Sequence, residues 1–114
     1  MKFSAHEFQA RLPLPASEKW PDGVWYTDAF HHGTMLLLYF APRFADHQTP
    51  HDQDEIYVIV SGGAQLTTST GTEPVAQGDA VFVPAGDSHR FENMSEDFAA
   101  WVVFWGPSGG ENGD

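Results

Sequence analysis

The sequence predicts an all-β protein that begins with one short helix. Between residues 24 and 105 the chain consists of about eight short extended segments rich in β-branched and aromatic residues, which favour strands. Gly, Pro, Asn, Asp and Ser separate these segments at short, even intervals. A helix-start pattern occurs only near the N-terminus, so strands do not alternate with helices. This pattern is typical of an antiparallel sandwich or barrel, and we expect one domain of that kind.

The helix signal lies at the start of the chain. Ser4 and Glu7 have the spacing of a capping box, which predicts a helix from Ala5 to about Leu12, where Pro13 ends it. The residues after Gly106 are rich in Gly and acidic residues, which predicts a flexible tail. The predicted parts are a helix and extended arm (1–23), a β-barrel (24–105) and the tail (106–114).

Turn residues determine the boundaries of the predicted strands. The second and the last of these strands are apolar at consecutive positions, which predicts burial on both faces. The predicted strands cover residues 24–30, 34–40, 56–60, 64–68, 80–83, 88–92 and 98–105.

The charge balance limits the partners of the chain. It has 114 residues, of which 16 are acidic and 5 basic, with a formal net charge of −11. Such a surface repels phosphate backbones and anionic lipid, so we expect no nucleic acid and no membrane as partners. No apolar run approaches the ~18 residues of a membrane-spanning helix, and no signal-peptide pattern is present, which predicts a cytoplasmic location. Cys is absent, so a bound metal would be held by His, carboxylate, amide or water.

One stretch combines metal-ligating residues with a predicted core strand. His51 and Glu55 lead into the apolar run Ile56–Val60. Because side chains in a strand repeat their facing every two residues, His51, Gln53 and Glu55 face inward together if the extended geometry begins early enough. An unpaired imidazole and carboxylate in an apolar interior cost several kcal/mol, on the order of 2–7 per polar group, whereas both are ready ligands for a cation. We therefore expect a metal site at the start of this strand.

A second histidine lies in a comparable setting. Pro84 and Gly86 form a turn before a predicted strand in which His89 and Phe91 share one face. Facing side chains on neighbouring strands lie ~5 Å apart, so His89 could meet His51 across the interior of a barrel.

The spacing around His89 resembles the second motif of the cupin superfamily. That motif is Gly, five residues, Pro-x-Gly, two residues, His, three residues and Asn. Gly78, Pro84, Gly86, His89 and Asn93 fill every place in it.

The stretch around His51 resembles the first cupin motif, which is His-x-His, three or four residues, Glu, six residues and Gly. His51, Glu55 and Gly62 fill its last three places with the three-residue spacing, and Thr49 stands in the place of the first His. The interval between the two motifs is short, as in small single-domain cupins. Both motifs in this order make the resemblance a specific one.

The resemblance implies a double-stranded β-helix, or jelly-roll, barrel with a divalent metal inside. Carried over place by place, the implied metal ligands are His51, Glu55 and His89. Two histidines and one carboxylate suit Fe, Mn, Ni, Zn or Co.

The position of Thr49 leaves one ligand of the usual set missing, and two residues could supply a replacement. The amide oxygen of Gln53 has the same predicted facing as the His51 and Glu55 side chains, whereas His47 could reach the site from the preceding loop. We favour Gln53, because its facing needs no loop rearrangement.

The aromatic residues of the strands predict an apolar pocket around the metal. A small organic molecule is the expected ligand of such a pocket. The resemblance also implies a homodimer, which the apolar strands favour. The predicted pocket residues are Tyr39, Tyr57, Phe82, Phe91 and Phe104.

Three functions are compatible with these features. The first is a metal-dependent enzyme, with dioxygenase or isomerase chemistry at an open metal position. The second is a non-catalytic module that binds or senses a small ligand. The third is a structural metal site, which requires four protein ligands and so depends on both Gln53 and His47.

Overall fold

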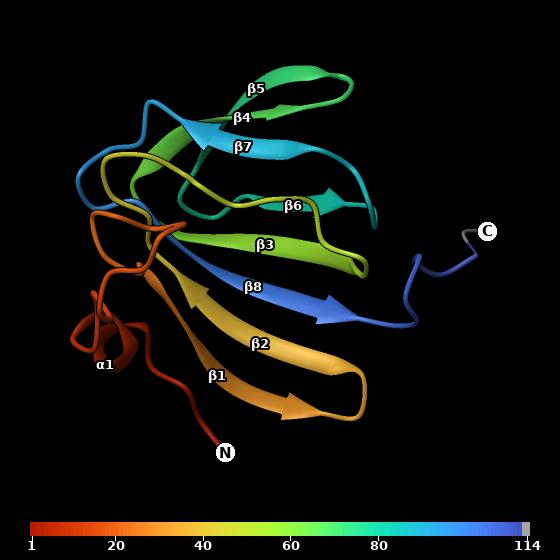
Figure 1. The fold of residues 1–114 in the computed structure, drawn as a ribbon, viewed down its shortest axis with the longest axis horizontal. Helices are drawn as coiled ribbons and strands as arrows, with labels where there is room; N and C mark the ends of the chain where they lie inside the picture. The colour runs from red at the N-terminus through yellow and green to blue at the C-terminus, as the bar shows by residue number, and fades with distance from the viewer. Residues whose placement is uncertain (113–114) are drawn as a thin grey trace.

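The computed structural model describes residues 1–112, which form one helix and eight strands (Figure 1). The all-β prediction with one short helix is confirmed. The elements are α1 (Ala5–Gln9), β1 (Tyr26–His32), β2 (Met35–Phe40), β3 (Asp54–Ser61), β4 (Gly63–Thr68), β5 (Gly71–Ala76), β6 (Ala80–Val83), β7 (His89–Glu92) and β8 (Ala99–Trp105).

The strands form two antiparallel sheets. One has five strands in the order β1-β2-β8-β3-β6, and the other has three in the order β5-β4-β7 (Figure 1). β8, the last strand of the chain, therefore lies between β2 and β3, and β7 lies beside β4 rather than beside β6. These long-range pairings bring the end of the chain next to its middle, as in a jelly roll.

The core lies between the inner faces of the two sheets. Tyr57 and Val102 on the five-stranded sheet belong to the same buried cluster as Leu66 and Phe91 on the three-stranded sheet. Facing alternates along β3, where Tyr57 is 1% exposed and its neighbour Val58 is 41% exposed. This alternation also directs Glu55 inward, so the strand places a carboxylate in the core.

The helix α1 differs from the prediction. It covers Ala5–Gln9 and ends three residues earlier than expected, and the Ser4 side chain makes no capping hydrogen bond. The capping-box prediction is therefore wrong. A helix this short gains its stability from docking, and Phe8 packs edge-on against Trp101 with ring centroids 5.7 Å apart on the outer face of the five-stranded sheet.

The segment after β8 hydrogen-bonds to the start of β3 and to the β1–β2 turn. The amide of Gly109 donates to the carbonyl of Asp52 at 2.6 Å, and the amide of Glu111 donates to the Asp54 carboxylate at 2.9 Å. The predicted flexible tail also includes residues 113–114, which lie outside the described residues, and its mobility stays a prediction. Within residues 1–112, no helix has the length and apolar character needed to cross a bilayer.

Candidate metal centre

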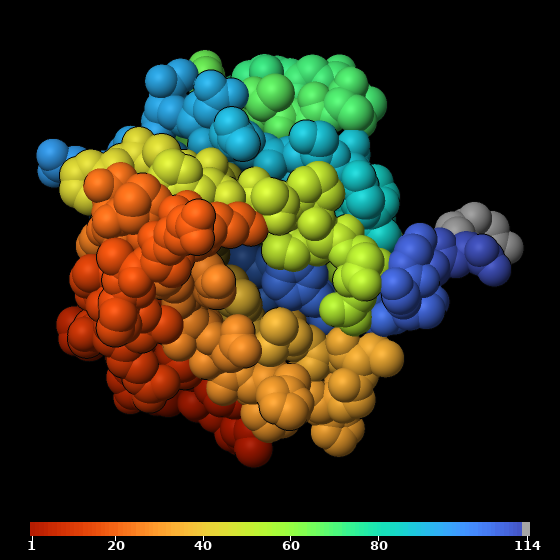
Figure 2. Space-filling model, viewed as in Figure 1, coloured from red at the N-terminus to blue at the C-terminus, as the bar shows by residue number. Residues whose placement is uncertain are grey.

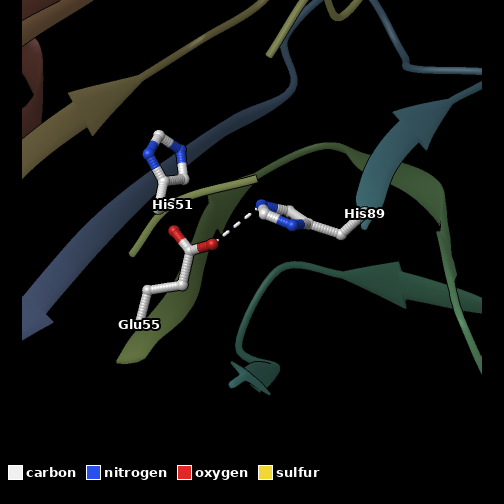
Figure 3. Close-up of side chains that lie close together, drawn as sticks. All are labelled: His51, Glu55 and His89. Atoms are coloured by element: carbon white, nitrogen blue, oxygen red, sulfur yellow. Dashed lines mark ion pairs between the residues drawn. The ribbon is translucent and has the colours of Figure 1, made fainter. Parts of the chain in front are cut away.

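Three potential metal ligands come from three separate segments and point toward one another (Figure 3). Glu55 is the second residue of β3, His89 is the first residue of β7, and His51 lies in the loop that leads into β3. One ligand atom from each of the three lies within 4.8 Å of the others. Within the described residues this is the one such group of His, Asp and Glu, and it consists of the residues that the two motifs predict.

Hydrogen bonds fix the orientation of His89. Its Nδ1 lies 2.9 Å from the carbonyl oxygen of Asp87, which can only accept, so Nδ1 carries the proton in that bond. Its Nε2 then faces the site, 2.7 Å from Glu55 Oε1. Desolvation acts to lower the pKa of His89, but the hydrogen bonds to Glu55 and to the Asp87 carbonyl outweigh it and raise that pKa.

The His51 side chain reaches the same group from the loop that precedes β3. Its ring lies against the Phe104 ring with centroids 4.7 Å apart, and 5.9 Å from the ring of His89. Desolvation is the largest cause of a lowered pKa of His51. The imidazole is therefore neutral at pH 7 and offers a lone pair, which is the form that binds metal.

The carboxylate of Glu55 has one oxygen without a protein partner. The residue is 1% exposed, and Oε2 is buried with no hydrogen bond from the residues described. A buried carboxylate oxygen left unpaired carries a desolvation penalty of several kcal/mol, roughly 1–3 or more. A cation held between Glu55, His51 and His89 would remove that penalty, so the donor set fits a divalent metal.

A chain of buried polar side chains reaches the same nitrogen of His89 that faces Glu55. The Tyr57 hydroxyl lies 3.0 Å from His89 Nε2 and donates to Gln48 Oε1 at 2.9 Å. The Gln48 amide donates in turn to Asp46 Oδ2 at 2.5 Å, and the same oxygen accepts the backbone amide of Phe91 at 2.9 Å. Desolvation raises the pKa of Tyr57 well above its usual value, so its hydroxyl remains a neutral donor.

Sequence reasoning missed Asp46 and Gln48. They lie in the loop before β3, outside both motifs and outside any strand whose facing could be read. The structure buries both, with 4% and 8% exposure. A polar pair in a loop gives no sequence signal that separates it from the solvated residues around it.

A cavity of about 100 Å³ opens beside His51. In Figure 2 the surface is hollowed between the loop that precedes β3 and the strands behind it, and atoms of β8 form its floor. Apart from His51, Gln48 and Lys19, its lining is aromatic or aliphatic: Trp20, Tyr26, Leu38, Phe40, Tyr57, Val102 and Phe104.

Gln53 and His47, the two weaker ligand candidates, lie outside the group of His51, Glu55 and His89. The Gln53 amide donates to the carbonyls of Thr34 and Gly106, at 3.1 and 2.9 Å, because β3 begins only at Asp54 and the alternating facing does not extend back to Gln53. His47 packs edge-on against Trp20 with ring centroids 5.3 Å apart. Neither belongs to the three-residue group.

Thr49, at the place of the first motif histidine, is exposed. Its hydroxyl accepts a hydrogen bond from the Lys19 ammonium at 2.9 Å. The position therefore contributes no donor to the interior and instead fixes Lys19 at the rim of the cavity.

The predicted pocket residues divide into two groups. Tyr57 and Phe104 line the cavity, and Phe91 packs against Tyr57 in the core with ring centroids 4.9 Å apart. Tyr39 and Phe82 are on the other side of the sheet: the Tyr39 hydroxyl donates to Gln9 of α1, and Phe82 is 54% exposed. Their positions along β2 and β6 give them outward facing, so they do not line this cavity.

The fold and the converging side chains define a small double-sheet β-barrel with a candidate metal site in its interior. The sequence profile described as "Cupin domain" matches residues 36–105. The chain therefore belongs to the cupin domain family, as its two motifs predict.

A curated relative from Streptomyces coelicolor is an uncharacterized protein. It is 50% identical over 62 residues, which are 54% of this chain and 59% of that protein. The match thus covers less than two thirds of the relative's length.

Three solved structures illustrate the similarity of fold. A cupin 2 conserved barrel domain protein from Salinispora arenicola has a TM-score of 0.60 at 22% identity, covering 71% of this chain and 74% of that chain. KdgF from a Halomonas species has a TM-score of 0.62 at 17% identity, covering 70% and 76%. The DMSP lyase DddQ from Ruegeria pomeroyi has a TM-score of 0.58 at 24% identity, covering 66% and 40%. At these identities the likeness concerns the fold alone.

Proposed function

We propose that this cupin binds a divalent first-row transition metal through His51, Glu55 and His89 and uses it to bind or transform a small organic molecule. The observation that carries the proposal is the convergence of three donors within 4.8 Å around a buried carboxylate oxygen that lacks a partner. Two imidazoles and one carboxylate suit Fe, Mn, Ni, Zn or Co. When bound, such a metal supplies Lewis-acid or redox chemistry at its open positions.

The residues around the site have separate roles in this proposal. His89 presents Nε2 because the Asp87 carbonyl holds its Nδ1 proton. The Tyr57 hydroxyl limits how far the His89 ring can move, since Gln48 holds that hydroxyl in turn. The aromatic and aliphatic lining of the cavity provides an apolar surface beside His51.

The cavity limits the class of ligand. Its volume of about 100 Å³ limits it to a compact molecule or one end of a longer one. Its lining is mostly apolar, and Lys19 is the one cation among the lining residues. A small molecule with an apolar part and an anionic group fits this lining best.

The positions of Gln53 and His47 favour an open site over a closed structural one. Structural metal sites are usually closed by four protein ligands, whereas the Gln53 amide bonds backbone carbonyls and His47 lies outside the three-residue group. An open position is what catalysis requires, and the named lyase among the structural neighbours belongs to a barrel of similar shape. A non-catalytic binding module is the second candidate, because the same metal site and cavity could bind a ligand without transforming it.

Metal content tests the proposal directly. Wild-type protein loaded with Mn, Ni, Zn or Co and desalted is expected to retain about one metal per chain. The His89→Ala and Glu55→Gln variants are expected to lose metal affinity about 100-fold or more, because each lacks one of three donors. Glu55→Gln has nearly the volume of the native side chain and lacks the buried charge, so it should fold even where His89→Ala does not.

His31→Ala is the matched control, because His31 is exposed on β1 and lies outside the three-residue group. It should retain wild-type metal content. Equal metal content in Glu55→Gln and wild-type protein would refute the proposed site. If the site binds metal, turnover of small anionic substrates would identify an enzyme, and tight binding without turnover would identify the binding module.

A further inference from the structure

His51 is the member of the three-residue group that lies outside any strand. Glu55 and His89 belong to β3 and β7, so backbone pairing fixes their positions, whereas His51 lies three residues before β3 begins. Its carbonyl oxygen accepts a hydrogen bond from the amide of Gly86 at 2.7 Å. Gly86 belongs to the turn 84–87, which precedes β7. The place of His51 in the site therefore depends on how its loop is held against this turn.

Asp54, the first residue of β3, joins the loop to the same turn. The residue is 7% exposed, and its Oδ1 accepts the backbone amide of Ala85 at 3.0 Å. The turn ends at Asp87, whose carbonyl accepts the Nδ1 proton of His89. The turn therefore contacts both histidine-bearing segments, and Asp54 supplies a charge-assisted hydrogen bond at this junction.

Residues 106–111, which we call the clasp, also bind Asp54. The amide of Glu111 donates to Asp54 Oδ2 at 2.9 Å, and the amide of Gly109 donates to the carbonyl of Asp52 at 2.6 Å. In Figure 2 this blue segment lies against the yellow-green loop that precedes β3. Each oxygen of the Asp54 carboxylate thus accepts one backbone amide, one from the turn and one from the clasp.

The clasp approaches Asp54 so closely that position 110 requires glycine. Gly110 has φ of +90°, and a Cβ built there would lie 2.8 Å from Asp54 Oδ1 and 3.1 Å from the Cβ of Ala85. The hydroxyl of Ser108 adds a hydrogen bond to the Asp52 carboxylate at 3.0 Å. A side chain at position 110 would therefore push the clasp away from Asp54.

We propose that Asp54 is a positioning residue of the metal site, and that the clasp acts through it to hold His51 within reach of the metal; this rests on the metal site proposed above. Amides occupy both oxygens of Asp54, and the residue is not in the group of converging ligand atoms, so it acts through the loop rather than as a ligand. A loop already held in the binding conformation loses less conformational freedom when His51 binds the metal, which strengthens binding.

Cobalt affinity, measured by competition with a chelator, tests the proposal. Asp54→Asn keeps the shape of the side chain, but its single carbonyl oxygen leaves one amide facing an NH₂ group. Its cobalt affinity should fall about 10-fold or more, as for other residues that orient a metal ligand. Gly110→Ala changes no residue between 51 and 55 and displaces the clasp, so it should weaken cobalt binding as well.

Hydrogen exchange of the metal-free protein supplies a readout that needs no metal. In both variants the Gly86 amide should exchange faster than in the wild type, because its hydrogen bond to the His51 carbonyl opens more often. Circular dichroism checks that the variants fold, and urea denaturation measures how much stability each one loses.

Asp79→Asn is the matched control. Asp79 Oδ2 accepts the amide of Ala76 at 2.8 Å in the turn before β6, and the Asp79 carbonyl accepts the amide of Ile59 toward the other end of β3. The substitution removes the charge from the same kind of carboxylate–amide bond away from the metal site. This variant should bind cobalt like the wild type, and a loss as large as that of Asp54→Asn would overturn the proposal.

A second background separates positioning from a general loss of structure. In a His51→Ala chain, Asp54→Asn should weaken cobalt binding no further, because no ligand is left for it to position. An equal loss in both backgrounds would overturn the proposal, as would wild-type affinity in Asp54→Asn or in Gly110→Ala. Wild-type protein that binds no cobalt would refute the metal site and the inference together, whereas cobalt bound equally well by wild type and Asp54→Asn would refute the inference alone.

Discussion

His89 and Glu55 form a close pair at the point where the metal is proposed to bind. The pair is buried, with 2.7 Å between Nε2 and Oε1, and the pKa of His89 is raised despite its desolvation. The pKa of His51 is lowered, chiefly by desolvation, so His51 is neutral around pH 7. Metal binding must therefore displace a proton from His89 and none from His51.

The raised pKa of His89 predicts how metal affinity depends on pH. His89 remains protonated from its unfolded pKa of about 6.5 up to its raised folded pKa, so affinity should rise about tenfold per pH unit in that window and level off above it. Calorimetric zinc titrations in two buffers of different ionisation enthalpy should show proton release on metal binding below the folded pKa of His89, and this release should fall toward zero above that pKa. Constant affinity and no proton release from pH ~6 to ~9 would contradict the proposed role of the pair.

The same shifts determine how the two histidines affect the stability of the metal-free protein. Because the folded pKa of His89 is raised, its contribution is present below about pH 6.5 and is lost as pH rises through the folded pKa. The folded pKa of His51 is lowered, so its contribution is present above about pH 6.5 and is lost as pH falls through the folded value. The two effects oppose each other and favour stability near neutral pH.

The residues of the candidate site could be predicted only where they belong to a motif or to a regular strand. His51, Glu55 and His89 follow from motif spacing, and for Glu55 also from the alternation along β3. Gln53 lies two residues before Glu55, so strand alternation would give both the same facing. The strand begins only at Asp54, however, so the facing of Gln53 could not be inferred. Whether a loop buries its polar residues depends on tertiary contacts that no local pattern encodes.

Among the secondary-structure elements, the turn between β3 and β4 is the most constrained. Gly62 has φ of +70°, and a Cβ built there would lie 2.6 Å from Asp97 Oδ1 and 2.8 Å from the Phe98 backbone nitrogen. A side chain at this position would push the loop before β8 away from β3. Glycine is therefore required here for space as well as for backbone conformation.

Gly62→Ala should lower the free energy of unfolding by about 2–4 kcal/mol, because strain and overpacking add. Gly78→Ala is the control: its φ is +95°, but a Cβ there would meet no atom within 4 Å, so about 1 kcal/mol of backbone strain is expected. Urea denaturation of both variants measures the difference. Equal losses of stability would show that the close approach at Gly62 does not matter.

The elements were predictable to different degrees. Strands with strong apolar patterns, such as Ala80–Val83, were found with the correct boundaries. The strand Gly71–Ala76 was missed because it contains Pro74 and little apolar content, and it is tolerated because β5 is an edge strand. The helix α1 is shorter than expected because the amides of Arg11 and Leu12 donate to carbonyls three residues back, not four, so the chain forms turns after Gln9.

At the scale of the whole molecule, the strand order determines the site. β8 pairs with both β2 and β3, and β7 pairs with β4, so residues nearly forty positions apart meet inside the barrel. Local patterns predict strands and turns but not which strands pair, and the expected jelly roll came from the cupin resemblance. The inner face of the five-stranded sheet thus carries the candidate metal site, and its outer face packs against α1.

The most direct test of this account is a crystal structure of the metal-loaded protein with anomalous diffraction collected at the absorption edge of the metal. The account predicts one strong anomalous peak within ~2.0–2.3 Å of His51, Glu55 and His89, with at least one coordination position open toward the cavity beside Phe104. A peak elsewhere on the acidic surface, with the three side chains unliganded at saturating metal, would contradict it.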